Sequence, residues 1–320
     1  MKAPETPLST HEKVRVTRAA GIIGLATLIS RVLGFIRDMV VAAIFGASLA
    51  ADAFYVAYRI PSLLRELFAE GSMSAGFVPV FTEYLTKCSR EDARRLAHAA
   101  FTIVLLVLTL VSLLGILLAP WLVRAIAPGF SDDPYKAELT TFLTQLMFPY
   151  LLFIGLAALA MGMLNSLRSF AVPALSPAVY NLCVIGMVLW IAPLLTEPII
   201  GVAFGVVMGG LAQWLIQLPG LHQQSMAFRL RWEPSHEGLK RMGILLLPVL
   251  LGLSVSQINI FLNTLFASFL KEGSVTYLYY GMRLIHFPLG VLGIALATAI
   301  LPSMAVQAAN HARTELTDTL

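Results

Sequence analysis

Long runs of uncharged residues make up most of the chain, and their lengths indicate the lengths of its helices. Six of them exceed the roughly 20 apolar residues that are needed to cross the hydrocarbon of a bilayer. Two further apolar segments contain charged residues but have a similar length. The pattern therefore predicts about eight transmembrane helices. They are expected at 19–46, 50–83, 97–123, 138–165, 173–194, 198–219, 242–270 and 277–305.

Composition agrees with this pattern. The 320 residues are 58% hydrophobic and 12% charged, with a mean hydropathy of +0.80. Soluble chains carry about a quarter charged residues, so a soluble domain is excluded, as are disordered and collagen-like chains. The two cysteines, Cys88 and Cys183, are too far apart for a metal motif or a disulfide framework. The fold class expected is an all-α, polytopic membrane protein.

The basic residues between the expected helices indicate an orientation. With a cytoplasmic N-terminus, fourteen of them fall on the inner side and three on the outer side, which follows the positive-inside rule. Both ends of the chain are then cytoplasmic. A cleavable signal peptide is disfavoured, because Arg31 and Arg37 interrupt the first apolar segment. The three outer residues are Arg124, Lys136 and Lys271.

Five basic residues remain inside or at the margin of apolar segments, and all five are arginine. One arginine at the bilayer centre costs about 2.5–3.5 kcal/mol even on insertion scales. We therefore expect these side chains to converge on a water-filled interior, to reach an interface, or to be paired. They are Arg31, Arg37, Arg59, Arg65 and Arg283.

Pairing is available to only some of the arginines. Three acid–arginine sets are seven residues apart and share a helix face: Arg31 with Asp38, and Arg59 with both Asp52 and Glu66. Internal ion pairs are thus one interpretation of these residues. Arg283 has no acidic residue within ten positions. The surplus of guanidinium groups favours a second interpretation, an anionic ligand, for which phosphate is well matched to the forked donors.

A short internal repeat divides the chain. The segment 53–61 resembles 277–284, and at an offset of 224 Tyr55 falls on Tyr279 and Arg59 on Arg283. Many transporters consist of two such repeats with the substrate between them. We expect six helices in a first lobe and the first two of a second lobe, so the chain looks incomplete. The expected divisions are a tail 1–18, an N-lobe 19–219, a cytoplasmic linker 220–241, second-lobe helices 242–305 and a tail 306–320.

Several motifs closely resemble the MurJ (MviN) family, in order, from about residue 18 to 305. The resemblance implies a lipid II flippase of the multidrug/oligosaccharidyl-lipid/polysaccharide exporter superfamily. The family fold it implies has fourteen helices, which are two lobes of six helices and two additional helices. The motifs include Ser30–Asp38, Phe45–Ala47, Ala51–Phe54, Phe68–Gly71, Phe77–Pro79, Ala127–Phe130, Ser254–Gln257 and Gly273–Val275.

The resemblance also implies a substrate site. Its cationic cavity residues match four of the arginines identified above, and an aspartate of the family matches Asp52. Near Arg283, this chain has Met282 and His286 where the family commonly has acids, so Arg283 is expected to be less neutralised here. The expected substrate-binding residues are Arg31, Arg37, Asp52, Arg59, Arg65 and Arg283.

The function expected is translocation of lipid II from the inner to the outer leaflet of the bacterial cytoplasmic membrane, by alternating access. Alternatives are an exporter of another polyprenyl-pyrophosphate-linked glycan or of a drug, and an inactive truncated fragment. A glycosyltransferase is disfavoured, because the longest outer loop offers only Asp132, Asp133 and Glu138 as acids. No cofactor, metal or nucleic-acid partner is expected. Membrane lipid and cell-wall synthesis proteins are the other expected partners.

Overall fold

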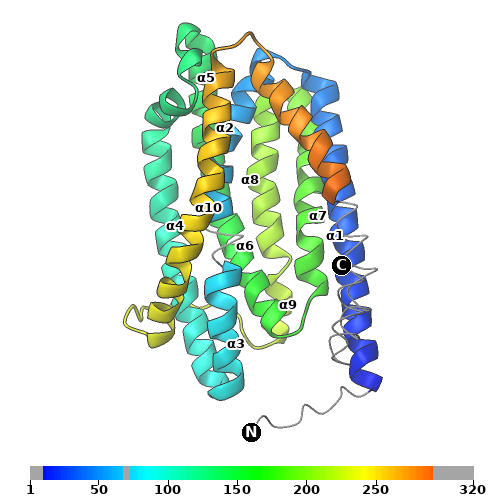
Figure 1. Cartoon of the computed structure of the whole chain (residues 1–320), viewed down its shortest axis with the longest axis vertical. Coiled ribbons are helices and arrows are strands. Elements are labelled where there is room, and N and C mark those ends of the chain that lie inside the picture. The colour runs from blue at the N-terminus through cyan, green and yellow to red at the C-terminus, as the bar shows by residue number, and fades with distance from the viewer. Residues whose placement is uncertain (1–9, 68–72, 291–320) are drawn as a thin grey trace, which may run out of the picture.

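The described chain is built of helices that run mostly along one long axis (Figure 1). The computed structural model describes residues 10–67 and 73–290, and no strand occurs within these ranges. The all-α class expected from the sequence is confirmed. The α-helices are α1 Thr10–Phe45, α2 Leu49–Arg65, α3 Val78–Lys87, α4 Arg90–Ile126, α5 Pro134–Met147, α6 Pro149–Ser166, α7 Ala171–Gly186, α8 Ile199–Leu215, α9 Leu218–Gln223 and α10 Glu237–Ser268, and residues 274–290 are also helical.

Five helical stretches within the described ranges are long and apolar enough to cross a membrane. Eight crossings stay a prediction, and parts of the expected helices 50–83 and 277–305 lie outside the described residues. The five stretches are Arg90–Ile126, Pro134–Ser166, Ala171–Leu194, Ile199–Gln223 and Glu237–Ser268.

Two of the expected helices are interrupted. The interval 138–165 contains α5 and α6, which meet at Phe148, and Pro149 occupies the first turn of α6. Proline suits this position because its missing N–H would have no partner there. The interval 50–83 is also divided, since α2 ends at Arg65 and a π-helical turn at Met73–Phe77 leads into α3. Apolar length alone therefore predicted the path of these segments but not their breaks.

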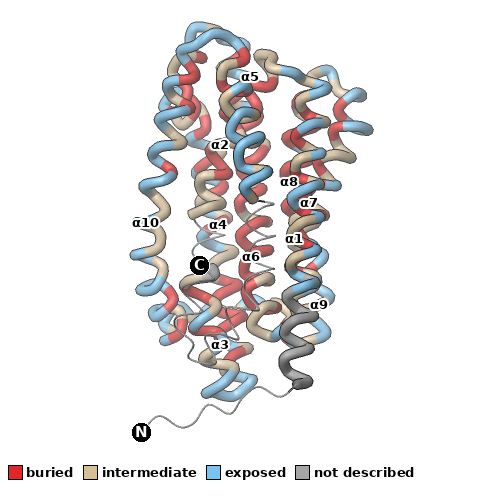
Figure 2. The backbone as a smooth tube through the Cα atoms, turned by 45° about the vertical axis from the view of Figure 1, so that its right-hand side comes forward, coloured by how far each residue is buried: buried red, intermediate tan, exposed pale blue. Residues whose placement is uncertain are grey.

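The hydrophobic core consists of two clusters placed one after the other along the bundle. One cluster packs α2, α5 and α8 together around residues such as Val56, Leu143 and Val202. The other packs α3 and α4 against α6 around Phe81 and Leu96. Helix α6 contributes to both clusters, and its tube is mostly in the buried colour in Figure 2. Helix α6 therefore connects the two clusters.

A seam joins α2 to the helix 274–290. Tyr55 stacks on Tyr279 with ring centroids 4.1 Å apart, and Asp52 accepts a hydrogen bond from the Thr276 hydroxyl at 2.7 Å. Both contacts join positions separated by 224 residues, which is the offset of the internal repeat. At a two-fold axis each residue meets its own equivalent. The seam therefore has the geometry expected where one repeat unit contacts its copy.

Candidate functional site

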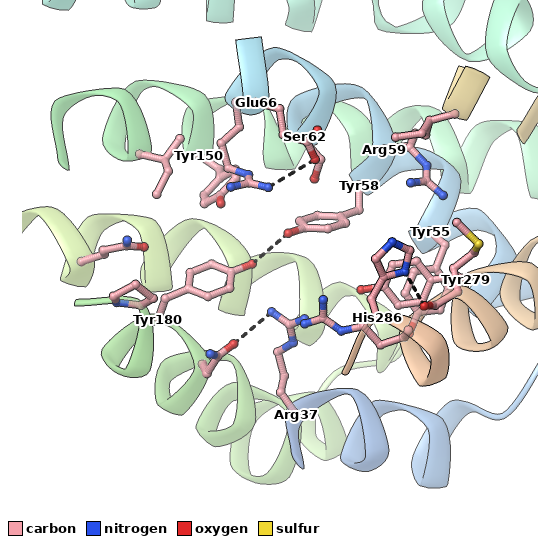
Figure 3. Close-up of a pocket in the computed structure, with 18 of the residues that line it drawn as sticks. Arg37, Tyr55, Tyr58, Arg59, Ser62, Glu66, Tyr150, Tyr180, Tyr279 and His286 are labelled. Carbon is pink, nitrogen blue, oxygen red and sulfur yellow. Dashed lines mark hydrogen bonds and ion pairs between the residues drawn. The ribbon is translucent and has the colours of Figure 1, made fainter. Parts of the chain in front are cut away.

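A cavity of about 540 Å³ lies within the bundle, and four arginines line it. Its walls come from α1, α2, α6, α7, α8, α10 and the helix 274–290 (Figure 3). The arginines are Arg37, Arg59, Arg65 and Arg283. The structure thus brings together four of the five arginines that the sequence singled out.

Arg37 is held in place by neighbours on two helices. Its Nη1 donates to Asn181 Oδ1 of α7 at 3.1 Å, and its Nε and Nη2 donate to Asp38 Oδ1 at 3.0 and 2.7 Å. The guanidinium carbon also lies 5.7 Å from the centre of the Tyr180 ring, within cation–π range. Only 12% of the side chain is exposed. Arg37 is therefore a fixed, partly buried charge rather than a mobile one.

Asp38 is shared by two arginines. It pairs with Arg37 and, across 245 positions of sequence, with Arg283. Asp38 supplies an acid to Arg283 from another helix, and the expectation that Arg283 is less neutralised than its counterparts in the family stays a prediction. The acids that share a helix face with Arg31 or Arg59 pair with other residues instead, so the ion-pair interpretation does not apply to these sets. Asp38 pairs with Arg37 and Arg283, Asp52 with Lys136, and Glu66 with Arg65. Seven residues of helix rise about 10 Å, so a shared face does not bring such groups into contact.

The remaining two arginines of the cavity differ in their surroundings. Arg65 lies 3.6 Å from Glu66, and Glu66 accepts a hydrogen bond from Gln257, which links α2 to α10. Arg59 makes no hydrogen bond or ion pair within the described residues, and Figure 3 shows its guanidinium reaching into the cavity. Among the described residues, the four arginines of the cavity are accompanied by two acids, Asp38 and Glu66.

Two expected site residues lie away from this cavity lining. Arg31 is exposed on α1 and lies against Gly290, beside the stacked pair Phe35 and Phe287 (ring centroids 4.3 Å apart). Asp52 is only 1% exposed. It accepts hydrogen bonds from the backbone N–H groups of residues 273 and 276 at 2.8 and 3.0 Å, as a helix N-cap would.

Asp52 also forms an ion pair with a lysine that had been assigned to an outer loop. Lys136 Nζ lies 3.0 Å from Asp52 Oδ2 and 3.9 Å from the centre of the Phe130 ring. Lys136 is only 8% exposed. The pair seats the start of the helix 274–290 on α2 and α5, so the observed contacts of Asp52 are with the protein itself.

Tyrosines form much of the cavity wall, and the sequence reasoning did not identify them as site residues. The hydroxyls of Tyr58 and Tyr180 lie 3.5 Å apart, and Tyr55, Tyr150 and Tyr279 also line the cavity. A signal was present, because Tyr55 and Tyr58 are three residues apart in an apolar segment and so share a helix face. Phenol groups supply a hydroxyl and an aromatic face together.

This set of side chains is suited to binding an anion that also carries hydroxyl groups. Guanidinium groups donate two parallel hydrogen bonds to phosphate oxygens, and tyrosine hydroxyls both donate and accept. Within the ranges that the structure describes, no group of three or more His, Cys, Asp or Glu residues could hold a metal ion. The chemistry of the lining is that of recognition.

The fold is that of a polytopic membrane transporter. A solved MATE transporter of Vibrio cholerae in its bent form matches with a TM-score of 0.63 over 95% of this chain and 69% of that one, at 16% identity. A solved lipid II flippase MurJ in an inward closed conformation matches with a TM-score of 0.75, at 25% identity, over 90% of this chain and 59% of that one.

Sequence relatives define the family. The family described as lipid II flippase MurJ matches residues 41–320, so the chain belongs to the MurJ family. The lipid II flippase MurJ of Burkholderia cenocepacia is 40% identical over 91% of this chain and 58% of its own length. A probable lipid II flippase MurJ of Vibrio cholerae is 42% identical over 91% of this chain and 57% of its own. The chain therefore spans less than three fifths of these relatives.

Proposed function

We propose that this chain forms the first lobe and the beginning of the second lobe of a flippase that moves lipid II from the inner to the outer leaflet. The observation that carries the proposal is the cavity lined by four arginines from three different helices. Lipid II carries a pyrophosphate, which guanidinium groups bind in two-pronged fashion. Its sugars fit the tyrosine lining, because stacked rings and phenol hydroxyls suit hydroxylated groups.

Alternating access accounts for the position of the seam. Asp52, Tyr55, Thr276 and Tyr279 close the contact between the two repeat units at the seam. Opening this contact, while the units approach each other elsewhere, would expose the cavity to the other side of the membrane. An inside-negative potential assists the outward movement of a pyrophosphate by about 2.3 kcal/mol per charge per 100 mV.

The proposed location is the bacterial cytoplasmic membrane, with both termini of the chain in the cytoplasm. The end of the bundle that carries α3, α9 and the start of α4 is then cytoplasmic (Figure 1). The α4–α5 connection, which holds Pro128–Asp132, is then outer. Its support is the fourteen-to-three distribution of basic residues under the positive-inside rule.

Export of another anionic glycolipid is the second candidate, because the same cavity chemistry would bind any polyprenyl pyrophosphate. A cationic drug is disfavoured by the four arginines of the lining. The proposed activity is transport rather than catalysis.

The test is complementation. A bacterium depleted of its own flippase would receive the coding region that contains this chain, and lipid II on the outer face would be measured by its accessibility to an added hydrolase. We expect growth and outer-face lipid II to recover. Recovery of drug efflux without outer-face lipid II would contradict the proposal.

The recognition mode is tested separately with Arg37→Lys. Lysine keeps the charge but cannot bond Asp38 and Asn181 with a planar fork, so most of the transport should be lost. Arg124→Lys, at an exposed position outside the cavity, is the matched control and should transport normally. Full activity of Arg37→Lys would show that positive potential alone is sufficient.

A further inference from the structure

The segment 224–236, between α9 and α10, does not extend away from the bundle. It is anchored first at the start of α4, where Arg90 and Arg94 donate to the carbonyl oxygens of Gln224 and Ser225 at 2.8 and 3.0 Å. It then runs along α4, forms a loop at the side of the bundle (Figure 1), and leads into the N-terminus of α10. We call residues 224–236 the linker arch.

The middle of the linker arch lies beside the apolar part of α4. Phe228 stacks on Phe101 with ring centroids 4.3 Å apart, and the backbone N–H of Arg231 donates to Thr102 Oγ1 at 2.8 Å. Thr102 is six residues into the uncharged run that begins at Leu96, which corresponds to about 9 Å along the helix. Irregular backbone at such depth needs its hydrogen bonds satisfied by the protein, and Thr102 does this for Arg231.

The outer surface of the arch combines apolar and basic side chains. Leu230 and Trp232 are 72% and 66% exposed, although both belong to residue types that avoid water. Arg229 is exposed beside them and has no ion-pair partner in the part of the chain that is described. Tryptophan with neighbouring arginine is typical of the membrane–water interface, where the ring enters the lipid and the cation reaches the phosphates.

The second arginine of the arch is already neutralised. Arg231 Nη2 donates to Glu233 Oε1 at 2.8 Å, and this hydrogen bond holds the pKa of the Glu233 carboxyl below its usual range. The carboxylate therefore stays charged at neutral pH and keeps Arg231 paired. Arg229 is left as the free positive charge of the arch.

We infer that the linker arch is a binding site for an acidic phospholipid of the cytoplasmic leaflet, with Leu230 and Trp232 among its acyl chains and Arg229 at its phosphate. The inference rests on the proposed orientation but not on transport. The joint between the lobes then lies in the lipid interface, and the acidic lipid content of the inner leaflet influences it. Charge complementarity selects an acidic over a zwitterionic headgroup.

The experiment uses Trp232 as its own reporter. The chain with Trp121, Trp190 and Trp214 replaced by phenylalanine would be reconstituted in phosphatidylcholine vesicles containing a minor fraction of brominated phosphatidylglycerol or brominated phosphatidylcholine. We expect brominated phosphatidylglycerol to quench Trp232 more strongly. If aqueous iodide quenches Trp232 and neither lipid does, the arch lies in water and the inference is overturned. If the two lipids quench Trp232 equally, the arch has no site for an acidic lipid.

Three variants locate the effect. A variant that retains only Trp190, which is 75% exposed and whose nearest charged residue in the sequence is Glu197, should show no preference between the two lipids. Arg229→Gln should lower the preference of Trp232 on the order of fivefold, the factor expected for one basic residue near the surface. Lys271→Gln, which removes an exposed charge elsewhere, should leave it unchanged.

If the triple phenylalanine variant does not fold, the difference in fluorescence between the unmodified chain and Trp232→Phe gives the same reading. A lipid preference that survives Arg229→Gln would contradict the assignment of the phosphate contact.

Discussion

The α5–α6 stretch and α10 have the same mean hydropathy, 2.0, and opposite surroundings. In Pro134–Ser166, 72% of the apolar core is buried inside the protein, whereas in Glu237–Ser268 the share is 6% (Figure 2). Seven of the exposed apolar side chains of α10 follow one another at helical spacing. They are Ile244, Leu247, Leu251, Val255, Ile258, Leu262 and Phe266.

The difference shows that hydropathy measures compatibility with lipid and not contact with protein. In a membrane, an apolar side chain gains little by leaving lipid for another helix, so packing depends on small residues and shape. A Cβ added at Gly155 or Gly162 of α6 would meet Leu108 or Phe77, whereas a Cβ added at Gly243 or Gly252 of α10 would meet no other part of the protein within 4 Å. The α5–α6 stretch is therefore packed mostly by protein, whereas α10 has one exposed apolar face.

The largest expected effect is loss of transport by the 320-residue chain expressed by itself. The chain spans 58% of the relative from Burkholderia cenocepacia, and α10 is only 6% buried, whereas alternating access needs two complete lobes. Cells depleted of their own flippase should not grow when they express only this chain. Its presence in the membrane fraction would be verified. The whole relative from Burkholderia cenocepacia is the positive control, and rescue by the 320 residues alone would refute the expectation.

A second prediction addresses the buried ion pair at the seam between α2 and the helix 274–290. Asp52→Asn leaves Lys136 charged and buried, and removal of one partner of a buried pair typically destabilises by about 3–5 kcal/mol. We expect a lower unfolding temperature, monitored by tryptophan fluorescence in detergent. Asp52→Asn combined with Lys136→Met removes the unpaired charge and should recover part of the loss. If the double variant is as unstable as the single one, the ion pair is not the cause.

A matched pair of glycine substitutions tests packing directly. A Cβ at Gly201 of α8 would lie 2.7 Å from Ala192 Cα, so Gly201→Ala should destabilise by about 1–3 kcal/mol through overpacking. Gly252→Ala on α10 meets nothing within 4 Å and should stabilise by up to about 1 kcal/mol, since alanine is the better helix former. Equal effects in unfolding experiments would remove the distinction between the two regions.

The smallest effect is expected at the exposed ion pair between α3 and α10. Arg241 Nη2 lies 2.7 Å from Glu83 Oε2, and both groups are accessible to water and ions. Glu83→Gln should lower the unfolding temperature slightly at low salt and not at all at high salt, because surface pairs are weak and screened. A large shift that persists in high salt would show that this pair contributes to holding α10 in place.

The helices and the cluster of arginines could be predicted from the sequence, because a lipid environment requires both. A span needs its length of apolar residues, and an arginine within one has to avoid lipid. The identity of each partner was not accessible. Asp38 meets Arg283 across 245 positions, and Asp52 meets Lys136 across 84. Such pairs depend on which helices lie side by side, and the shared hydropathy of α5–α6 and α10 shows that apolar pattern does not contain that information.

The seam between α2 and the helix 274–290 has a consequence for how duplicated segments diverge. A residue on the axis between two copies faces its own counterpart, so it has to be complementary to itself. Tyrosine satisfies this condition, because two rings stack, and Tyr55 still faces Tyr279. Aspartate does not, because two carboxylates at that distance would repel each other. The counterpart of Asp52 is Thr276, whose hydroxyl and backbone N–H both donate to the carboxylate. The same residue can therefore occupy both copies at the position of Tyr55 and Tyr279, but not one helical turn away, at the position of Asp52 and Thr276.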